Sequence, residues 1–106
     1  MLEKDTTTLA MLEQLRSRLG PVAFVIADHW EGDLCAVGIA APSNPGVLIY
    51  ISTFGSSIGE FDYELELPPT AGSDAIYEVA GRGSGLSIEE LTDVVAKHLK
   101  RASTLN

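Results

Sequence analysis

The chain is short of basic residues, and this shortage excludes several classes of partner. Its 106 residues include fifteen acids but only seven Lys and Arg, which gives a net charge of −8. Between Asp28 and Asp93 there are twelve acids and one base, Arg82, so this central segment alone carries −11. A field of this sign repels phosphate polymers and anionic membranes, and it attracts basic proteins. We therefore expect a basic protein partner, and neither nucleic acid nor a membrane surface.

Long apolar runs and paired cysteines are also missing. The longest apolar run, Val22 to Ala27, falls far short of the roughly 20 residues that a membrane-spanning helix needs. The first residues lack the basic and apolar regions of a signal peptide, which predicts a cytoplasmic protein. The one cysteine, Cys35, has no partner for an internal disulfide and lies in an apolar segment. A buried structural thiol is its expected state.

What the chain does have is the composition of one globular domain. Apolar residues make up 45% of it and charged residues 21%, a mixture that buries a core and does not stay disordered. A chain of this length can bury a single core without metal or disulfide support. We expect one domain over residues 1–106, with residues 1–5 disordered, residues 102–106 forming a frayed tail, and no cofactor.

The clearest pattern is residues 60–67, in which acids and apolar residues alternate without exception. As a β-strand this segment places Phe61, Tyr63, Leu65 and Leu67 on one face, and Glu60, Asp62, Glu64 and Glu66 on the other. Neighbouring carboxylates on one face stand about 6.6 Å apart, so each pair repels by about 0.6 kcal/mol in water and about 2.5 kcal/mol at an effective dielectric of about 20. The acidic face must therefore meet either water or a basic partner, and the pattern leaves both open.

Hydrophobic spacing predicts a helix over residues 6–19, with threonines available as its N-cap, and a second helix after Ser87. Ser87 and Glu90 form the capping-box sequence that marks the start of a helix. Four further segments have the composition of strands: residues 22–27, 34–40, 47–51 and 75–82. The first of them is expected to be a central strand because it is apolar throughout.

The expected fold is α+β, with the element order α-β-β-β-β-β-α. The connections are too short for parallel crossovers, so the five strands should form an antiparallel meander sheet. The N- and C-terminal helices would cover one face of this sheet, which gives a two-layer sandwich. An edge strand could pair across a two-fold axis, so a monomer and a homodimer both remain open.

The segment between the first two predicted strands gathers polar residues. Asp28, His29, Glu31 and Asp33 are potential metal ligands, but their spacing matches no ligand motif, so we expect a hairpin turn and no metal. Trp30 in this turn either packs over the edge of the core or serves a partner as an anchor. The predicted partner-binding residues are Trp30, Glu31, Asp33, Glu60, Asp62, Glu64 and Glu66.

The glycine-rich residues 81–85 are expected to form the turn between the last strand and the last helix. Flexible N–H groups, a positive helix end and one cation also leave a weak anion site as an alternative. Its residues would be Arg82, Gly83, Ser84 and Gly85. The segment matches neither the phosphate loop nor the dinucleotide fingerprint. The alternative function is therefore a small ligand-binding or regulatory domain.

Residue types for nucleophilic catalysis are present without a recognisable motif. Ser56, Ser57 or Cys35 could be paired with His29 or His98, but no spacing in the chain supports such a pair. A partly buried state is expected for His98 because it lies near the apolar stripe of the last helix. We assign no catalytic residue and expect a protein that is not an enzyme.

Three segments carry a family resemblance: Phe24 to Leu34, Gly46 to Ile51, and Leu86 to Ala96. With the layout of residues 22–100, they resemble the small immunity proteins encoded beside bacterial polymorphic and contact-dependent toxins. The resemblance implies an acidic, non-enzymatic, cytosolic protein that binds one cognate toxin domain and blocks its active site or holds it inactive. It supplies no catalytic motif. The expected function is therefore an immunity-type inhibitor that occludes a basic toxin domain.

Overall fold

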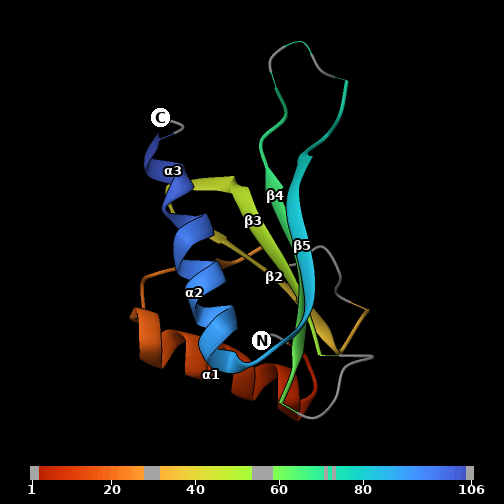
Figure 1. The fold of residues 1–106 in the computed structure, drawn as a ribbon, viewed down its shortest axis with the longest axis vertical. Helices are drawn as coiled ribbons and strands as arrows, with labels where there is room; N and C mark the ends of the chain where they lie inside the picture. Colours follow the sequence, from red (N-terminus) through yellow and green to blue (C-terminus); the bar gives the residue numbers. More distant parts are fainter. Residues whose placement is uncertain (1–2, 28–31, 54–58, 71, 73, 105–106) are drawn as a thin grey trace.

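The computed structural model describes residues 3–27, 32–53, 59–70, 72 and 74–104 (Figure 1). One helix, five strands, a second helix and a short third helix follow one another along the chain. Their bounds are α1 Thr6–Leu19, β1 Val25–Ile26, β2 Ala36–Ala41, β3 Asn44–Ser52, β4 Phe61–Leu67, β5 Glu78–Leu86, α2 Ile88–Leu99 and α3 Arg101–Thr104. The predicted α+β class is confirmed. No helix in these residues is long and apolar enough to span a membrane.

The five strands form one antiparallel sheet in the order β1-β2-β3-β4-β5, which confirms the predicted meander. Helices α1 and α2 lie on one side of this sheet (Figure 1). We call the opposite side the open face, because no helix of the described chain packs on it. Strand alternation assigns these residues to the open face: Ala36, Gly38, Ala40, Leu48, Tyr50, Ser52, Asp62, Glu64 and Glu66.

The hydrophobic core lies between the helices and the sheet. Helix α1 contributes Met11, Leu12 and Leu15, and α2 contributes Leu91 and Val95. The strands contribute Phe24 just before β1, and Val37, Ile39, Ile49, Ile51 and Phe61. Tyr63 and Leu65 pack against this core, and Leu67 packs on a smaller cluster beside it. The prediction that the apolar side of residues 60–67 faces the helices is therefore confirmed.

Helix α1 has the predicted bounds but differs in its cap and its buried face. Asp5 is the N-cap in place of a threonine, and its Oδ1 accepts a hydrogen bond from Thr8 N at 2.7 Å. Gly20, with φ of 106°, ends the helix in a conformation that favours glycine. Thr8 and Met11 are buried, whereas the apolar residue Leu9 is exposed.

Strand β1 is an edge strand, so the prediction of a central strand over residues 22–27 is wrong. It has two residues and pairs with β2. Val22 is 82% exposed and Val25 is 43% exposed. An apolar run indicates a hydrophobic segment, but the number of neighbouring strands depends on topology. The centre of the sheet belongs to β2 and β3, and every residue of β2 is buried.

Strand β5 covers Glu78–Leu86 and not residues 75–82, so the segment predicted as a glycine-rich turn is part of the sheet. Gly83 pairs with Tyr63 on β4. A Cβ at Gly83 would stand 2.7 Å from Tyr63 Cε1, so the absence of a side chain lets the ring lie against the strand. Within this segment only Gly85 has a left-handed φ, 72°, at the bend that leads into α2.

Both ends of the described chain are better held than predicted. Lys4 is buried and its Nζ donates to Asp33 O at 2.7 Å, where a disordered segment was expected. Arg101–Thr104 form α3 with Ala102 buried, so residues 102–104 of the expected frayed tail 102–106 are helical, and residues 105–106 lie outside the described chain. Between them α2 begins as predicted, because Ser87 Oγ accepts from Glu90 N at 3.2 Å and Glu90 Oε1 accepts from Ser87 N at 3.0 Å.

Candidate functional site

The open face gathers polar and charged side chains on its β3, β4 and β5 strands. The register pairs Tyr50 with Glu64 and Ser52 with Asp62, and it pairs Glu64 with Arg82. Paired residues of antiparallel strands present their side chains on the same face, so these groups are neighbours. A shallow hollow of about 270 Å³ lies among them, lined by Tyr50, Asp62, Tyr63, Glu64, Arg82, Gly83 and Ser84.

The four predicted acids of residues 60–67 have different environments. Glu60 is exposed, Asp62 and Glu64 are half-buried, and Glu66 is only 8% exposed. We call these four acids the acid ladder. The alternation is compatible with four acids that are all exposed to water, but in the structure their exposure falls along the strand from Glu60 to Glu66.

Strand β5 contacts the two middle acids of this ladder. Asp62 Oδ1 accepts from Gly85 N at 3.1 Å, and Arg82 Nη2 lies 3.8 Å from Glu64 Oε2. The guanidinium is largely exposed, so the ion pair contributes at most about 1 kcal/mol to stability. Because this ion pair is weak, a cationic group from another molecule could replace or join Arg82 beside Glu64 at a cost of at most about 1 kcal/mol.

The same two contacts engage groups of the predicted anion site. Its residues Arg82, Gly83, Ser84 and Gly85 lie along β5, so they do not form a turn in front of α2. The N–H of Gly85 and the guanidinium of Arg82 are directed to carboxylates. Glu90 stands in the first turn of α2 as part of the capping box. The chain's own acids thus occupy several of the groups that an anion would use.

Tyr50 lies among the carboxylates of the open face. Burial raises the pKa of its hydroxyl, and the negative charges of Asp33, Glu64 and Asp62 raise that pKa further. We call Asp33, Tyr50, Asp62 and Glu64 the acidic surface. Its tyrosine is half-buried, and a hydrogen bond with the side chain of Ser52 partly offsets the rise in its pKa. The sequence pattern did not single out Tyr50, although alternation along β3 places it on the face opposite to the isoleucines of that strand.

Asp33 is the one member of the predicted turn cluster that lies in the described chain. Its Oδ1 accepts from Cys35 N at 2.9 Å, and its charge reaches Tyr50. Asp33 and the β4 acids Asp62 and Glu64 thus all act electrostatically on the same tyrosine. The remaining members lie outside the described residues: Asp28, His29, Trp30 and Glu31.

Cys35 is a half-buried thiol held by a carboxylate, and so it is less buried than predicted. Its Sγ–H donates to Asp5 Oδ2 at 3.1 Å. This hydrogen bond is the main reason why the pKa of Cys35 is raised, and the bond from Thr8 N–H is the main reason why the pKa of Asp5 is lowered. A raised thiol pKa reduces the population of thiolate, which is the nucleophilic form.

His98 is 1% exposed and ties α2 to the sheet. Its Nε2–H donates to Leu48 O at 3.0 Å and to Glu66 O at 2.9 Å. Carbonyl oxygens only accept, so Nε2 carries a proton, while Nδ1 is buried and has no hydrogen-bond partner within the described chain. Burial is the main reason why the pKa of His98 is lowered, and the charge of Arg101 lowers it further.

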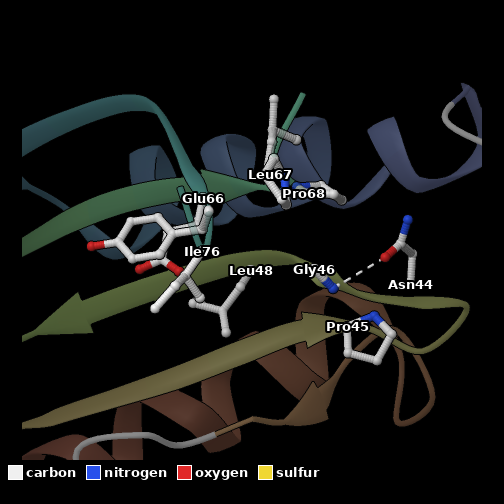
Figure 2. A pocket seen from close by; sticks show the side chains of 10 residues that line it. Asn44, Pro45, Gly46, Leu48, Glu66, Leu67, Pro68 and Ile76 are labelled. Atoms are coloured by element: carbon white, nitrogen blue, oxygen red, sulfur yellow. Dashed lines mark hydrogen bonds between the residues drawn. The ribbon is translucent and has the colours of Figure 1, made fainter. Parts of the chain in front are cut away.

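Next to the acidic surface, an apolar pocket of about 430 Å³ lies where β3 begins and β4 ends. Figure 2 shows Leu48 and Ile76 on one side of it, and Asn44, Pro45 and Gly46 on the other. Glu66 supplies a carboxylate to the lining. The other lining residues are Leu67, Pro68, Pro69 and Tyr77. The sequence pattern did not indicate this pocket, because its walls come from three separate segments.

Metal-binding geometry is lacking over the described parts of the chain, where no group of three or more His, Cys, Asp or Glu is placed to hold an ion. The chain matches no protein-family model, no curated protein and no solved structure. Two features of the described surface are candidates for a functional site: the acidic surface around Tyr50 and the apolar pocket beside it.

Proposed function

We propose that this chain is a non-enzymatic protein-binding module that docks a basic protein on the open face of its sheet. The observation that carries the proposal is the asymmetry of the sheet. Two helices cover one face, while Asp62 and Glu64 of β4 lie beside Tyr50 of β3 on the other. A face of this kind offers both charge and an aromatic contact to a partner.

Electrostatics favour a basic partner for two reasons. Lysine or arginine from outside relieves the repulsion among neighbouring carboxylates, which is about 2.5 kcal/mol per pair at an effective dielectric of about 20. The net charge of −8 also accelerates the encounter with a cationic protein. Tyr50 then supplies contact area that does not depend on charge.

The resemblance to immunity proteins extends this proposal to a specific role. In that role the partner is a basic toxin domain, and the chain inhibits it stoichiometrically by occluding its active site. Inhibition would then require neither chemistry nor a cofactor on the chain. The alternative of a ligand site at residues 81–85 gains no support, because Asp62 and Glu64 contact the donors there.

Complex formation is the direct test. The genes beside the one that encodes this chain are searched for a toxin domain. Its purified product is mixed with the chain and passed over a sizing column at about 0.1 M salt, where the Debye length is about 10 Å. We expect a one-to-one complex and loss of the toxin's activity. Two separate peaks at this salt concentration would contradict the proposal.

Charge reversal then tests the surface. The double variant Glu60→Lys with Glu64→Lys should slow association with that partner about tenfold, because rim charges act mainly on the association rate. The matched control is Glu13→Lys with Asp93→Lys, which changes the net charge equally but places both changes on exposed helix positions. If both double variants slow association to the same extent, the open face is not the docking surface.

A further inference from the structure

We propose that the apolar pocket beside the acidic surface is the anchor site for one apolar side chain of the partner, and that lysine or arginine lies two residues from this side chain in the partner's sequence. The inference rests on the proposed function, because it takes the partner to be a basic protein. It adds the kind of segment that is recognised.

The first argument is the size and character of the pocket. Its volume of about 430 Å³ is within the range of ordinary ligand sites and exceeds the needs of one leucine or phenylalanine side chain. Two of its walls are large apolar residues that the core does not use, since Ile76 is 89% exposed and Tyr77 is 44% exposed. Apolar side chains that gather at a hollow mark a binding site more often than single exposed ones do.

The second argument is that the side of the pocket formed by β3 and β4 is held in shape by the fold. A Cβ at Gly46 would stand 2.8 Å from Pro68 Cγ, so the start of β3 and the end of β4 are in close contact. Asn44 Oδ1 accepts from Gly46 N at 3.1 Å and fixes the turn at the rim. From the helix side, His98 binds the carbonyl oxygens of the two strands that form the floor. A preformed pocket costs little ordering on binding.

The third argument is charge. Glu66 lines the pocket, and the next acid along the same face of β4 is Glu64. Two residues along a strand correspond to about 6.6 Å, and in an extended partner segment residues two apart also point to the same side. An apolar side chain seated in the pocket would therefore place a basic side chain two positions away over the acidic surface.

A peptide titration tests this inference without the natural partner. The probe is Lys-Gly-Phe-Gly-Lys with its ends acetylated and amidated, added to the isotopically labelled chain while its amide resonances are followed. We expect saturable shifts at the amides of Gly46, Leu48 and Glu66, with a dissociation constant on the order of millimolar. Replacing Phe by Ala in the peptide should weaken binding about tenfold or more, and replacing both Lys by Glu should abolish it.

Variants of the chain locate the binding. Ile76→Ser should weaken binding of the phenylalanine peptide several-fold, because it removes an apolar wall. Val22→Ser is the matched control, because Val22 is equally apolar and 82% exposed but does not line the pocket, and it should bind as the native chain does. Both residues are exposed, so neither change should impair folding.

The outcomes separate this inference from the proposed function. Equal binding of the phenylalanine and alanine peptides, with shifts around Tyr50 and Asp62, would overturn the anchor site and leave the acidic docking surface standing. No shift with several millimolar phenylalanine peptide would also overturn the anchor site. Phenylalanine-dependent binding that is lost in Ile76→Ser would support the anchor site even if the natural partner proved indifferent to charge reversal on β4.

Discussion

At the scale of a single residue, the carboxylate of Asp5 makes two hydrogen bonds with different consequences. One of its oxygens caps α1 at Thr8 N, and the other accepts from the thiol of Cys35, which joins the first helix to the start of the second strand. The hydrogen bond holds the proton on sulfur and raises the pKa of Cys35. The same residue thus stabilises a helix end and suppresses thiol reactivity.

Removing the charge of Asp5 should release that reactivity. Asn can still cap the helix, so Asp5→Asn keeps the fold while the pKa of Cys35 falls toward that of a free cysteine. Alkylation by iodoacetamide at pH 8, followed by mass spectrometry, should become several-fold faster than in the native chain. Glu3→Gln removes an exposed charge nearby and serves as the control. Equal rates for native chain and Asp5→Asn would show that the hydrogen bond does not govern the thiol.

His98 should make stability depend on pH in a defined direction. Its pKa is lowered in the folded state from an ordinary value of 6.5, so the unfolded chain takes up the proton first as the pH falls. The contribution of neutral His98 to the free energy of unfolding is therefore present above pH 6.5. Below pH 6.5 the free energy of unfolding declines by at most about 1.4 kcal/mol per pH unit. Asp5, Glu78 and Glu90, whose pKa values are lowered, act in a more acidic range.

Urea denaturation at several values between pH 7.5 and 5.5 measures this dependence. The native chain should lose stability across the interval, whereas His98→Gln, which lacks the titrating ring, should give a flatter profile at lower overall stability. A profile for His98→Gln that is as steep as that of the native chain would assign the dependence to another group.

At the scale of secondary-structure elements, β5 owes its place in the sheet to residues that usually weaken strands. Gly83 leaves room for the ring of Tyr63 on β4, and Gly81 lies opposite Leu65, whose side chain packs near its backbone. Glycine loses more conformational freedom on folding than other residues, and the packing of these side chains against the bare backbone offsets that cost. The alternating sequence of β4 and the glycines of β5 are therefore two parts of one arrangement.

The two glycines should differ when they are replaced by alanine. Gly83→Ala brings a methyl group within 2.7 Å of the Tyr63 ring and should destabilise the chain by about 1–3 kcal/mol. Gly81→Ala meets only Leu65 Cδ1 at 3.6 Å, an ordinary contact, and should be neutral or stabilising by about 0.5 kcal/mol. Urea midpoints of both variants measure the difference, and equal midpoints would contradict the packing of Tyr63 under β5.

At the scale of the whole molecule, charge and cover are distributed unevenly over the two sides of the sheet. The basic residues other than Arg82 lie in residues 4–18 and 97–101, which are the helical ends of the chain, while twelve acids lie between Asp28 and Asp93. Three of these acids, Glu89, Glu90 and Asp93, lie on α2 among basic residues of the helical side. Asp62, Glu64 and Glu66 lie on the open face beside Arg82, so this face has an excess of negative charge. Such an asymmetry orients an approaching cationic partner before contact.

Association with a basic partner should depend strongly on salt. The Debye length falls from about 10 Å at 0.1 M to about 3 Å at 1 M, so steering by the acidic surface is nearly abolished at the higher concentration. Stopped-flow measurements should show the association rate falling at least tenfold across this range, while the dissociation rate changes less. An association rate that is independent of salt would exclude electrostatic docking.

Much of the fold could be predicted because it depends on local patterns. The helix spacing gave α1 its correct bounds, the capping box marked the first residue of α2, and the alternation of residues 60–67 fixed which side of β4 enters the core. The errors arose where the structure of a segment depends on which other strands lie beside it. An apolar run was placed at the centre of the sheet although it lies at the edge, and a glycine-rich strand was predicted as a turn.

The candidate site was predictable in part for the same reason. The acids of β4 were assigned to one face from their period alone, and Asp33 was added from composition. Tyr50 was missed because nothing in its own strand indicates which carboxylates surround it. The pocket was missed because Gly46, Pro68 and Ile76 come from three segments that only the folded chain brings together.

The sequence by itself determined the sign of the charge, the class of fold and the division of β4 into an apolar and an acidic side, because each depends on composition or on a period of a few residues. The tertiary structure decided the order of burial along the acids, from exposed Glu60 to buried Glu66, and the position of the pocket next to them. Burial of a side chain depends on what other strands and loops place over it, and that information is not local.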